Sequence, residues 1–396
     1  MDDLVIENGM EEDESDGITD ENVFSDAVIW GTDWTTETIA LQIARGNINL
    51  NPDFQRRDAW SKQNKSKLIE SLILGIPVPP IVLAEDQNNR NHYIVIDGKQ
   101  RLLSIMQFYM GNKKISEEIK NSRYDLLKLT GLEVLPSLNK KDYSEIPDKY
   151  LSNIDNGTIR TIAIKNWPNE NFLYTVFLTL NTGSLKLSTQ ELRQALKPGP
   201  FLSYLDKASA NSNSIMKMLN NSSSDKRMRD VELALRFFGF KYFMQEYKGN
   251  LRAFLDYTCE NLNKMWEEKK TEYEEYFKEL ENAIDFSFEL FESYPFSRYL
   301  NKKSTKSFNR CIFELFSYYF SDRETREKIG NKKESFVEAF LELNDDPLFE
   351  QSVLAYPKVT EKVVRRFNMF SNMLTKIDNS LSFQKFEYFG ASIEVV

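Results

Sequence analysis

Residues 93–108 read YIVIDGKQRLLSIMQF, and this stretch decides the fold of the first half of the chain. Its first four residues are apolar or aromatic and predict a strand, while the apolar residues from Leu102 to Phe108 recur at helical spacing. The strand therefore runs directly into a helix through Asp97 and Gly98. A helix N-terminus presents unpaired backbone N–H groups and a partial positive charge, so the sequence predicts an anion-binding site at this junction.

The five residues from Asp97 to Arg101, DGKQR, carry the chemistry expected at the junction. Gly98 would let an anion approach the backbone, and Lys99 and Arg101 would supply positive charge. Asp97 would hold a metal ion or a water molecule, or accept hydrogen bonds from a ribose or an arginine. The alternative is that Asp97 only caps the helix and Arg101 lies on its surface. The sequence contains neither GxxxxGK[ST] nor GxGxxG, so neither a P-loop nor a Rossmann motif accounts for the junction.

The segments around the junction alternate between helical and extended patterns, as expected for a mixed α/β domain. Ser61 is a predicted N-cap, and Gly75 follows the last apolar residues of its helix. Ser188 and Glu191 form the capping-box pattern of a later helix. The polar segment 112–156 receives no predicted element. The predicted helices cover residues 35–44, 61–75, 99–108 and 172–180, and the predicted strands lie at residues 48–51, 81–83, 93–96 and 162–164.

Pro198 and Pro200 interrupt the last helix of this region, and the chain beyond them shows almost only helical periodicity, as in residues 231–247, 262–291 and 307–320. The 28 Phe and 18 Tyr residues fit large helical cores, with stacking surfaces as the alternative. The sequence therefore predicts an α+β protein. Its parts are a disordered acidic tail over residues 1–26, an α/β domain over 27–200 and a mostly α-helical domain over 201–396.

Charge is distributed unevenly along the 396 residues, whose formal net charge is −9. The first 44 residues contain 13 acidic residues and no lysine or arginine, which leaves 47 acidic against 51 basic residues in the rest of the chain. Residues 1–26 are too polar and too charged to bury a core, so we expect a mobile, solubilising tail. The alternative is a tail that competes with nucleic acid for a basic groove.

The rarest residue types exclude several kinds of site. His92 is the single histidine, and Cys259 and Cys311 have no partners at ligand spacing, so no multi-histidine metal site, zinc ribbon or disulfide framework is expected. The two cysteines are predicted to be buried, and His92 to lie at a turn or strand edge. No apolar run approaches the ~18 residues that span a bilayer, and the acidic N-terminus is unlike a signal peptide. We expect a cytoplasmic protein without membrane contact.

Several motifs, taken in order, resemble those of a known family. They read NPDFQR at residues 51–56 with Trp60 after it, KLIES at 67–71, IPVPPI at 76–81, IDGKQRL at 96–102, NTG at 181–183 with Leu187, Ser188 and Glu191, and RDVEL at 229–233. In this order and spacing they resemble the N-terminal domain of GmrSD-type restriction endonucleases, which belongs to the wider ParB/sulfiredoxin-like superfamily. The resemblance covers about residues 35 to 260.

The resemblance implies a nucleotide-binding, NTP-hydrolysing regulatory domain used in prokaryotic defence against foreign or modified DNA. Arg56 and Arg101 would neutralise phosphates, Asp97 and Arg101 would act in catalysis, and Mg2+ would be bound mainly by the phosphates of the NTP. Family members carry glutamine where Lys99 stands, which bears on hydrolysis more than on binding. The implied pocket consists of Gln55, Arg56, Asp97, Gly98, Lys99, Gln100 and Arg101.

Many relatives also carry an HNH-like nuclease domain with a His-x-x-Pro motif, on the same chain or on a partner, and this sequence contains no such motif. The leading hypothesis is therefore an NTP-dependent regulatory subunit that acts with a separately encoded nuclease or effector. The alternative is a non-enzymatic DNA-binding or assembly module, for which Arg227, Arg229 and Lys241 beside an aromatic helix are the candidate contacts. Nuclease activity of the α/β domain itself ranks last, because no histidine base or carboxylate cluster supports it.

Overall fold

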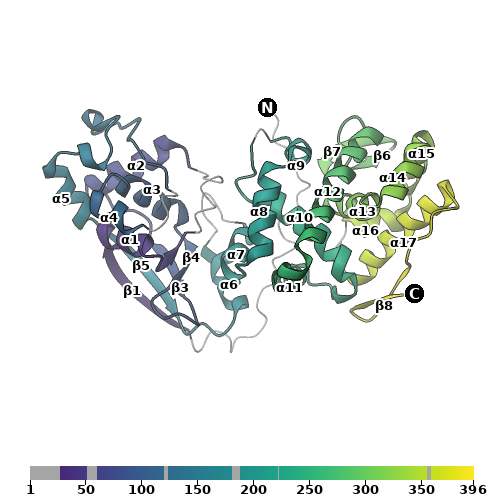
Figure 1. Cartoon of the computed structure of the whole chain (residues 1–396), viewed down its shortest axis with the longest axis horizontal. Helices are drawn as coiled ribbons and strands as arrows, with labels where there is room; N and C mark the ends of the chain where they lie inside the picture. The colour runs from purple at the N-terminus through teal and green to yellow at the C-terminus, as the bar shows by residue number, and fades with distance from the viewer. Residues whose placement is uncertain (1–26, 51–59, 120–123, 181–187, 222, 355–357) are drawn as a thin grey trace. The chain divides into compact units, whose positions relative to one another are not determined.

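The structure is a computed structural model that describes residues 27–50, 60–119, 124–180, 188–221, 223–354 and 358–396. The chain divides into two compact units between Leu196 and Lys197, and each is described by itself (Figure 1). The first unit holds a five-stranded sheet with helices, and the second is built almost entirely of helices. The predicted α+β class is confirmed.

The sheet of the first unit has the strand order β1-β5-β3-β4-β2. Pairing is antiparallel between β1 and β5 and between β3 and β4, and parallel between β5 and β3 and between β4 and β2. In the central strand β3 the apolar run from Ile81 to Ala84 is buried throughout, as expected of a strand covered on both faces. The strands are β1 (Val28–Thr35), β2 (Ile48–Asn49), β3 (Ile81–Glu85), β4 (Tyr93–Asp97) and β5 (Thr158–Lys165).

Helices cover both faces of this sheet. Alternate residues of β3 belong to different cores: Ile81 packs with residues of α1 to α5, and Val82 packs with residues of α6 and α7. The helices are α1 (Thr36–Ala44), α2 (Lys62–Ile73), α3 (Lys99–Tyr109), α4 (Lys113–Glu118), α5 (Asp148–Asn156), α6 (Glu170–Leu180) and α7 (Thr189–Leu196), with short 3-10 turns η4 (Pro136–Leu138) and η5 (Tyr143–Glu145).

The predicted caps of this unit are confirmed. The Ser61 hydroxyl accepts a hydrogen bond from the Asn64 amide at the start of α2. Ser188 and Glu191 exchange the two hydrogen bonds of a capping box at the start of α7. The polar segment that received no predicted element contains α4 and α5, so that part of the prediction was incomplete. The predicted N-terminal tail lies outside the described residues.

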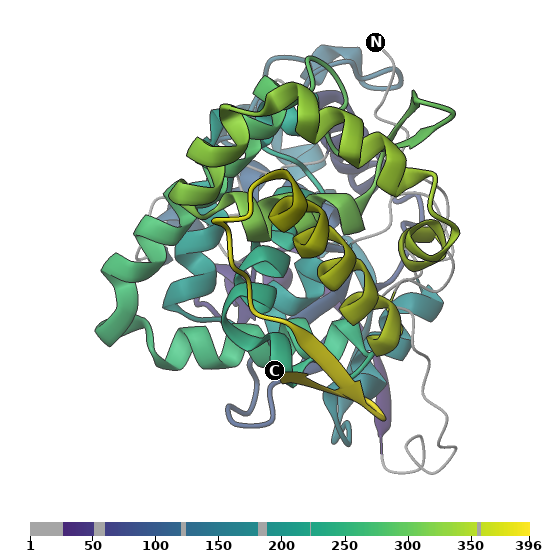
Figure 2. The same cartoon turned by 90° about the vertical axis from the view of Figure 1, so that its right-hand side faces the viewer.

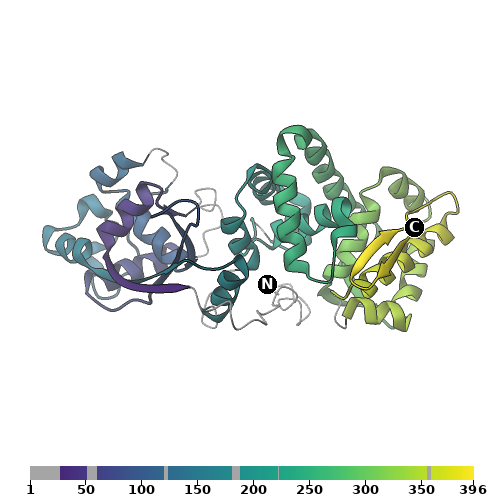
Figure 3. The ribbon, with the colours of Figure 1, turned by 90° about the horizontal axis from the view of Figure 1, so that it is seen from below.

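The second unit consists of helices and two hairpins. The hairpin formed by β8 (Phe386–Phe389) and β9 (Ser392–Val395) lies against α17 (Thr360–Ile377), as Figure 2 and Figure 3 show. The other hairpin pairs β6 (Ser297–Leu300) with β7 (Lys303–Phe308). The remaining elements are α8 (Pro200–Asn211), α9 (Asn213–Met218), α10 (Arg229–Phe243), η6 (Met244–Glu246), α11 (Leu251–Lys264), α12 (Trp266–Leu290), α13 (Arg310–Phe320), α14 (Arg323–Gly330), α15 (Lys333–Asn344) and α16 (Pro347–Leu354).

Aromatic side chains fill the core of this helical unit. The ring of Phe316 on α13 lies 5.1 Å from that of Phe340 and 5.6 Å from that of Phe370, centroid to centroid. Edge-on and tilted ring pairs of this kind stabilise a core beyond the area that they bury. Cys259 and Cys311 are buried, as predicted. Most of the aromatic content of the sequence therefore serves helical packing.

A carboxylate lies at the centre of the helical core. Glu314 on α13 accepts hydrogen bonds from Arg236 of α10 and Arg366 of α17, each at 2.8 Å. Arg236 also pairs with Glu232 at 2.9 Å. The side chains of Glu314 and both arginines are no more than 3% exposed. Three helices are therefore tied together by a charge network that solvent does not reach.

Candidate functional site

The candidate site is the junction between β4 and α3. Gly98 adopts a left-handed backbone conformation with φ +97°, which disfavours any residue with a side chain. A Cβ atom at this position would lie 3.0 Å from Cγ1 and 3.3 Å from Cα of Ile81 on the neighbouring strand. The left-handed backbone conformation and the close approach of β3 both therefore require glycine at this position. This gives Gly98 a structural role, where the sequence suggested an opening for an anion.

Arg101 and Asp97 face each other across this junction. A guanidinium Nη2 of Arg101 donates to Oδ2 of Asp97 at 2.8 Å and to the carbonyl oxygen of Pro80 at 2.9 Å. The Arg101 side chain is 13% exposed and that of Asp97 is 34% exposed. Asp97 thus acts as the partner of Arg101. The interpretation of Asp97 as the helix cap is wrong, because Gly98 occupies the N-cap position.

The start of α3 keeps donors available for an anion. Gly98, the N-cap residue of this helix, has no side chain with which to cap it. Nε of Arg101 is buried and has no hydrogen-bond partner within the described part of the chain. A buried donor without a partner calls for a physical explanation, and an incoming acceptor would provide one. The junction thus combines the partial positive charge of a helix start with a guanidinium that retains donor capacity.

Gln100 connects the junction to an earlier segment. Its Oε1 accepts a hydrogen bond from the Trp60 amide at 3.3 Å, and its backbone carbonyl accepts one from Ser104 at 2.6 Å. Lys99 is the first residue of α3. Gln55 and Arg56 lie outside the described residues, as does the Asn181-Thr182-Gly183 motif. Gln100 therefore holds the residue that directly follows the segment containing Gln55 and Arg56.

A buried lysine on α2 was missed by sequence reasoning. Nζ of Lys65 donates to Oε1 of Gln107 on α3 at 2.7 Å. Burial lowers the pKa of Lys65 to about 8, against the opposing effect of Asp125. The signal was present in the sequence, because Lys65 precedes Leu68 and Ile69 by three and four residues and so shares their apolar helix face.

The other candidates are dispersed. His92 is exposed in the turn before β4, with Nδ1 3.3 Å from the Arg90 carbonyl oxygen, which fits the predicted turn position. No group of three or more His, Cys, Asp or Glu side chains suited to a metal ion occurs in the described part of the chain. Asp97 therefore has no partner carboxylates there with which to form a protein-based metal cage.

The basic residues proposed for DNA contact do not share one exposed face. Arg227 is exposed, but Nη2 of Arg229 pairs with Oδ2 of Asp225 at 2.6 Å. Lys241 is half-buried, and its Nζ lies 5.0 Å from the centroid of the Tyr318 ring. Arg229 and Lys241 therefore both have partners within the protein, and contact of these residues with DNA stays a prediction.

The fold and the junction define a protein whose first unit is a mixed-sheet α/β domain with a paired arginine and aspartate at a strand-to-helix turn. Residues 39–196 match the family described as GmrSD restriction endonuclease, N-terminal domain. This part of the chain is similar to that family, whose description is of a restriction endonuclease. Comparisons with curated proteins and with solved structures gave no match. No helix of the described residues is long and apolar enough to cross a membrane.

Proposed function

We propose that this chain is the nucleotide-binding, NTP-hydrolysing regulatory subunit of a DNA restriction or anti-phage defence system. It would act with a separately encoded nuclease or effector on foreign DNA. The observation that supports the proposal is the Asp97–Arg101 pair at the start of α3, a helix whose N-cap residue is Gly98. This junction lies within the part of the chain that matches the GmrSD N-terminal family.

The phosphates of the nucleotide would bind at the start of α3. Backbone amides of a first helical turn and the helix dipole both favour negative charge. Arg101 would add a charge-assisted hydrogen bond through the donors that Asp97 and Pro80 leave unused. The Asp97 carboxylate holds the guanidinium in place before the ligand arrives, so little side-chain entropy remains to be lost on binding. Lys99 would contribute further positive charge.

Mg2+ fits this arrangement only as a companion of the nucleotide. Asp97 is a hard oxygen donor, but the described residues offer no group of three ligands around it. Mg2+ commonly takes one or two carboxylates and completes its shell with water and substrate phosphates. When bound, the ion would neutralise charge that develops on the transferred phosphoryl group. Asp97 is the residue of this junction that would hold or orient it.

Phosphate release from NTPs tests hydrolysis. We expect the wild-type chain with Mg2+ to turn over at least one of ATP, GTP, CTP and UTP. Asp97→Asn keeps the shape of the side chain and should lower turnover about a hundredfold. Lys99→Gln, which installs the residue of the family pattern, should retain activity. Equal turnover by wild type and Asp97→Asn would contradict a catalytic role for this carboxylate.

Incubation with duplex DNA tests the division of labour with a partner nuclease. The chain alone should leave duplex DNA intact with Mg2+ or Mn2+, since the residues that the structure describes place neither a histidine base nor a carboxylate cluster with Asp97. Cutting that follows the protein through purification and disappears in Asp97→Ala would contradict this expectation. A contaminating nuclease would not respond to the substitution.

A further inference from the structure

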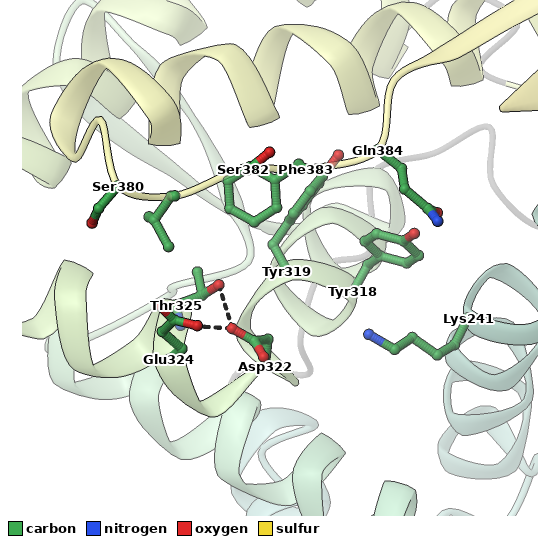
Figure 4. Close-up of a pocket in the computed structure, with 11 residues that line it drawn as sticks. Lys241, Tyr318, Tyr319, Asp322, Glu324, Thr325, Ser380, Ser382, Phe383 and Gln384 are labelled. Carbon is green, nitrogen blue, oxygen red and sulfur yellow. Dashed lines mark hydrogen bonds between the residues drawn. The ribbon is translucent and has the colours of Figure 1, made fainter. Parts of the chain in front are cut away.

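The helical unit contains a cavity of about 310 Å³ that is separate from the β4–α3 junction. Figure 4 shows Lys241 of α10 reaching into it from one side and Asp322 lying on the opposite side. Tyr318 and Tyr319 of α13, with Phe383 from the segment after α17, provide aromatic walls. The cavity therefore places a cation and a carboxylate opposite each other, with aromatic rings along another side.

Lys241 has donor capacity that the described part of the chain does not use. Its Nζ donates to the Ser321 hydroxyl at 3.2 Å and lies 5.0 Å from the Tyr318 ring and 5.8 Å from the Tyr276 ring. No carboxylate of the described chain forms an ion pair with it. An ammonium carries three donors, so two remain for an acceptor inside the cavity. Burial lowers the pKa of Lys241, and Asp322 opposes this effect.

Asp322 presents an acceptor from the other side. Its Oδ2 accepts hydrogen bonds from the amide and the hydroxyl of Thr325, both at 2.7 Å, which caps α14. Its Oδ1 makes no hydrogen bond to the described residues. The neighbouring Glu324 is paired with Lys328. One carboxylate oxygen of Asp322 is therefore available to a ligand that brings an N–H group.

We propose that this cavity binds a nucleobase. A planar heterocycle with acceptors on one edge and N–H donors on another satisfies Lys241 and Asp322 together and packs its faces against the aromatic walls. The volume of about 310 Å³ leaves room for a bicyclic base. Guanine fits best, because O6 and N7 are the acceptors that lysine commonly contacts and its N1–H and amino group suit a carboxylate.

Two sources of guanine satisfy this chemistry: a free nucleoside or nucleotide, and a base within single-stranded nucleic acid. Calorimetric titration of the full chain with guanosine, adenosine, cytidine and uridine addresses the first. Titration with a short oligothymidylate that carries one guanine, against the all-thymine strand, addresses the second. We expect guanosine to bind more tightly than the other nucleosides, or the guanine strand to bind more tightly than the all-thymine strand.

Two variants test the contacts. Lys241→Met keeps the side-chain stem and removes the donors, and should weaken guanine binding at least tenfold. Asp322→Asn places an N–H group where the ligand needs an acceptor and should have a similar effect, while asparagine still caps α14. Lys217→Met is the matched control, because Nζ of Lys217 also lies over an aromatic ring, 4.1 Å from the centroid of Phe288, but lines a different cavity.

The result of the nucleoside titrations does not depend on the proposed nucleotide site at the β4–α3 junction, because nucleosides lack the phosphates that Arg101 would contact. Arg101→Ala should leave guanosine binding unchanged. Binding that is equal in wild type, Lys241→Met and Asp322→Asn would overturn the assignment of this cavity. Failure of every nucleoside and strand to bind would also overturn it, as would preferential binding of phenylalanine or tyrosine as free amino acids. Thermal unfolding of each variant identifies loss of fold, and Asp322→Asn keeps the test valid if Lys241→Met is unstable.

Discussion

The two units of this protein both pair arginine with a carboxylate, but in different surroundings. In the helical unit, Glu314 joins Arg236 and Arg366 where all three side chains are no more than 3% exposed. At the β4–α3 junction, Asp97 holds Arg101 with 34% and 13% exposure. Breaking a desolvated ion pair costs several kcal/mol of stability, whereas an ion pair open to solvent contributes little and can exchange its partners. The first arrangement ties helices together, and the second leaves room for a ligand.

The largest expected effect of a substitution is at Glu314. Glu314→Gln removes the charge that compensates two buried arginines and should cost about 3–5 kcal/mol of unfolding free energy. Urea denaturation followed by circular dichroism measures it. Glu361→Gln is the matched control, because Glu361 pairs with Arg365 on the partly exposed side of α17 and should lose under ~0.5 kcal/mol. Similar losses in the two variants would contradict the distinction between buried and open pairs.

The next largest expected effect is a dependence of stability on pH that comes from Lys65. The folded protein releases the Lys65 proton near pH 8, whereas the unfolded chain keeps it to about 10.5. Between these values the unfolded state binds more protons, so this residue makes stability rise with pH, by up to about 3 kcal/mol. Denaturant unfolding of wild type and Lys65→Met at pH 7.5, 9 and 10.5 checks it. The stability of wild type relative to Lys65→Met should increase over this range, and a constant difference would contradict the lowered pKa.

Asp97→Asn tests the partly exposed pair, as Glu314→Gln tests the buried one. Because the Asp97–Arg101 pair is partly exposed and Asp97 does not cap α3, its loss should cost only ~0–1 kcal/mol. The same denaturation experiment used for Glu314→Gln measures it. A loss of several kcal/mol would mean that the junction is a structural brace like the Glu314 network, with no freedom to accept a ligand.

The smallest effect is expected from removing the acidic N-terminal segment. Residues 1–26 contain few apolar side chains to bury, so a chain that begins at Ala27 should unfold at nearly the same temperature as the full chain. Differential scanning calorimetry measures the difference. A decrease of several degrees would show that this segment contacts a folded unit, and would favour its role as an acidic competitor.

Local sequence signals were sufficient for the elements that form the junction. Ser61, the 93–108 stretch and the Ser188–Glu191 box each predict their element, because caps and apolar periodicity are local properties. β1 was missed because its partner β5 lies more than a hundred residues away, and pairing across that distance leaves no local pattern. The β6–β7 hairpin was missed because Asn301 and Lys302 adopt positive φ without the glycine that usually marks such a turn.

The sequence was sufficient to predict which residues form the site, but only some of the contacts that they make. The sequence placed Asp97 and Arg101 at one junction, and facing an arginine was among the roles considered for Asp97. Glycine is required at position 98 because Ile81 of a neighbouring strand lies close to it, and the sequence does not predict this contact. Lys241 was expected on a basic face and lies instead beside Tyr318 and Ser321, because its helix packs against α13. The surroundings of Lys241 depend on how two helices pack, and the residue type alone does not predict them.

Arg101 is the residue through which we propose that the β4–α3 junction binds nucleotide phosphate. Calorimetric titration of ATP, GTP, CTP and UTP with Mg2+ into wild type, Arg101→Ala and Arg160→Ala tests it most directly. Arg160 is the matched control, since it forms an exposed ion pair with Asp33 in the same unit. We expect wild type and Arg160→Ala to bind at least one nucleotide with equal affinity. Arg101→Ala should bind it ten- to hundredfold more weakly, a loss of ~1.5 to 3 kcal/mol. Equal affinity in Arg101→Ala, or no binding by wild type, would contradict the assignment of this site.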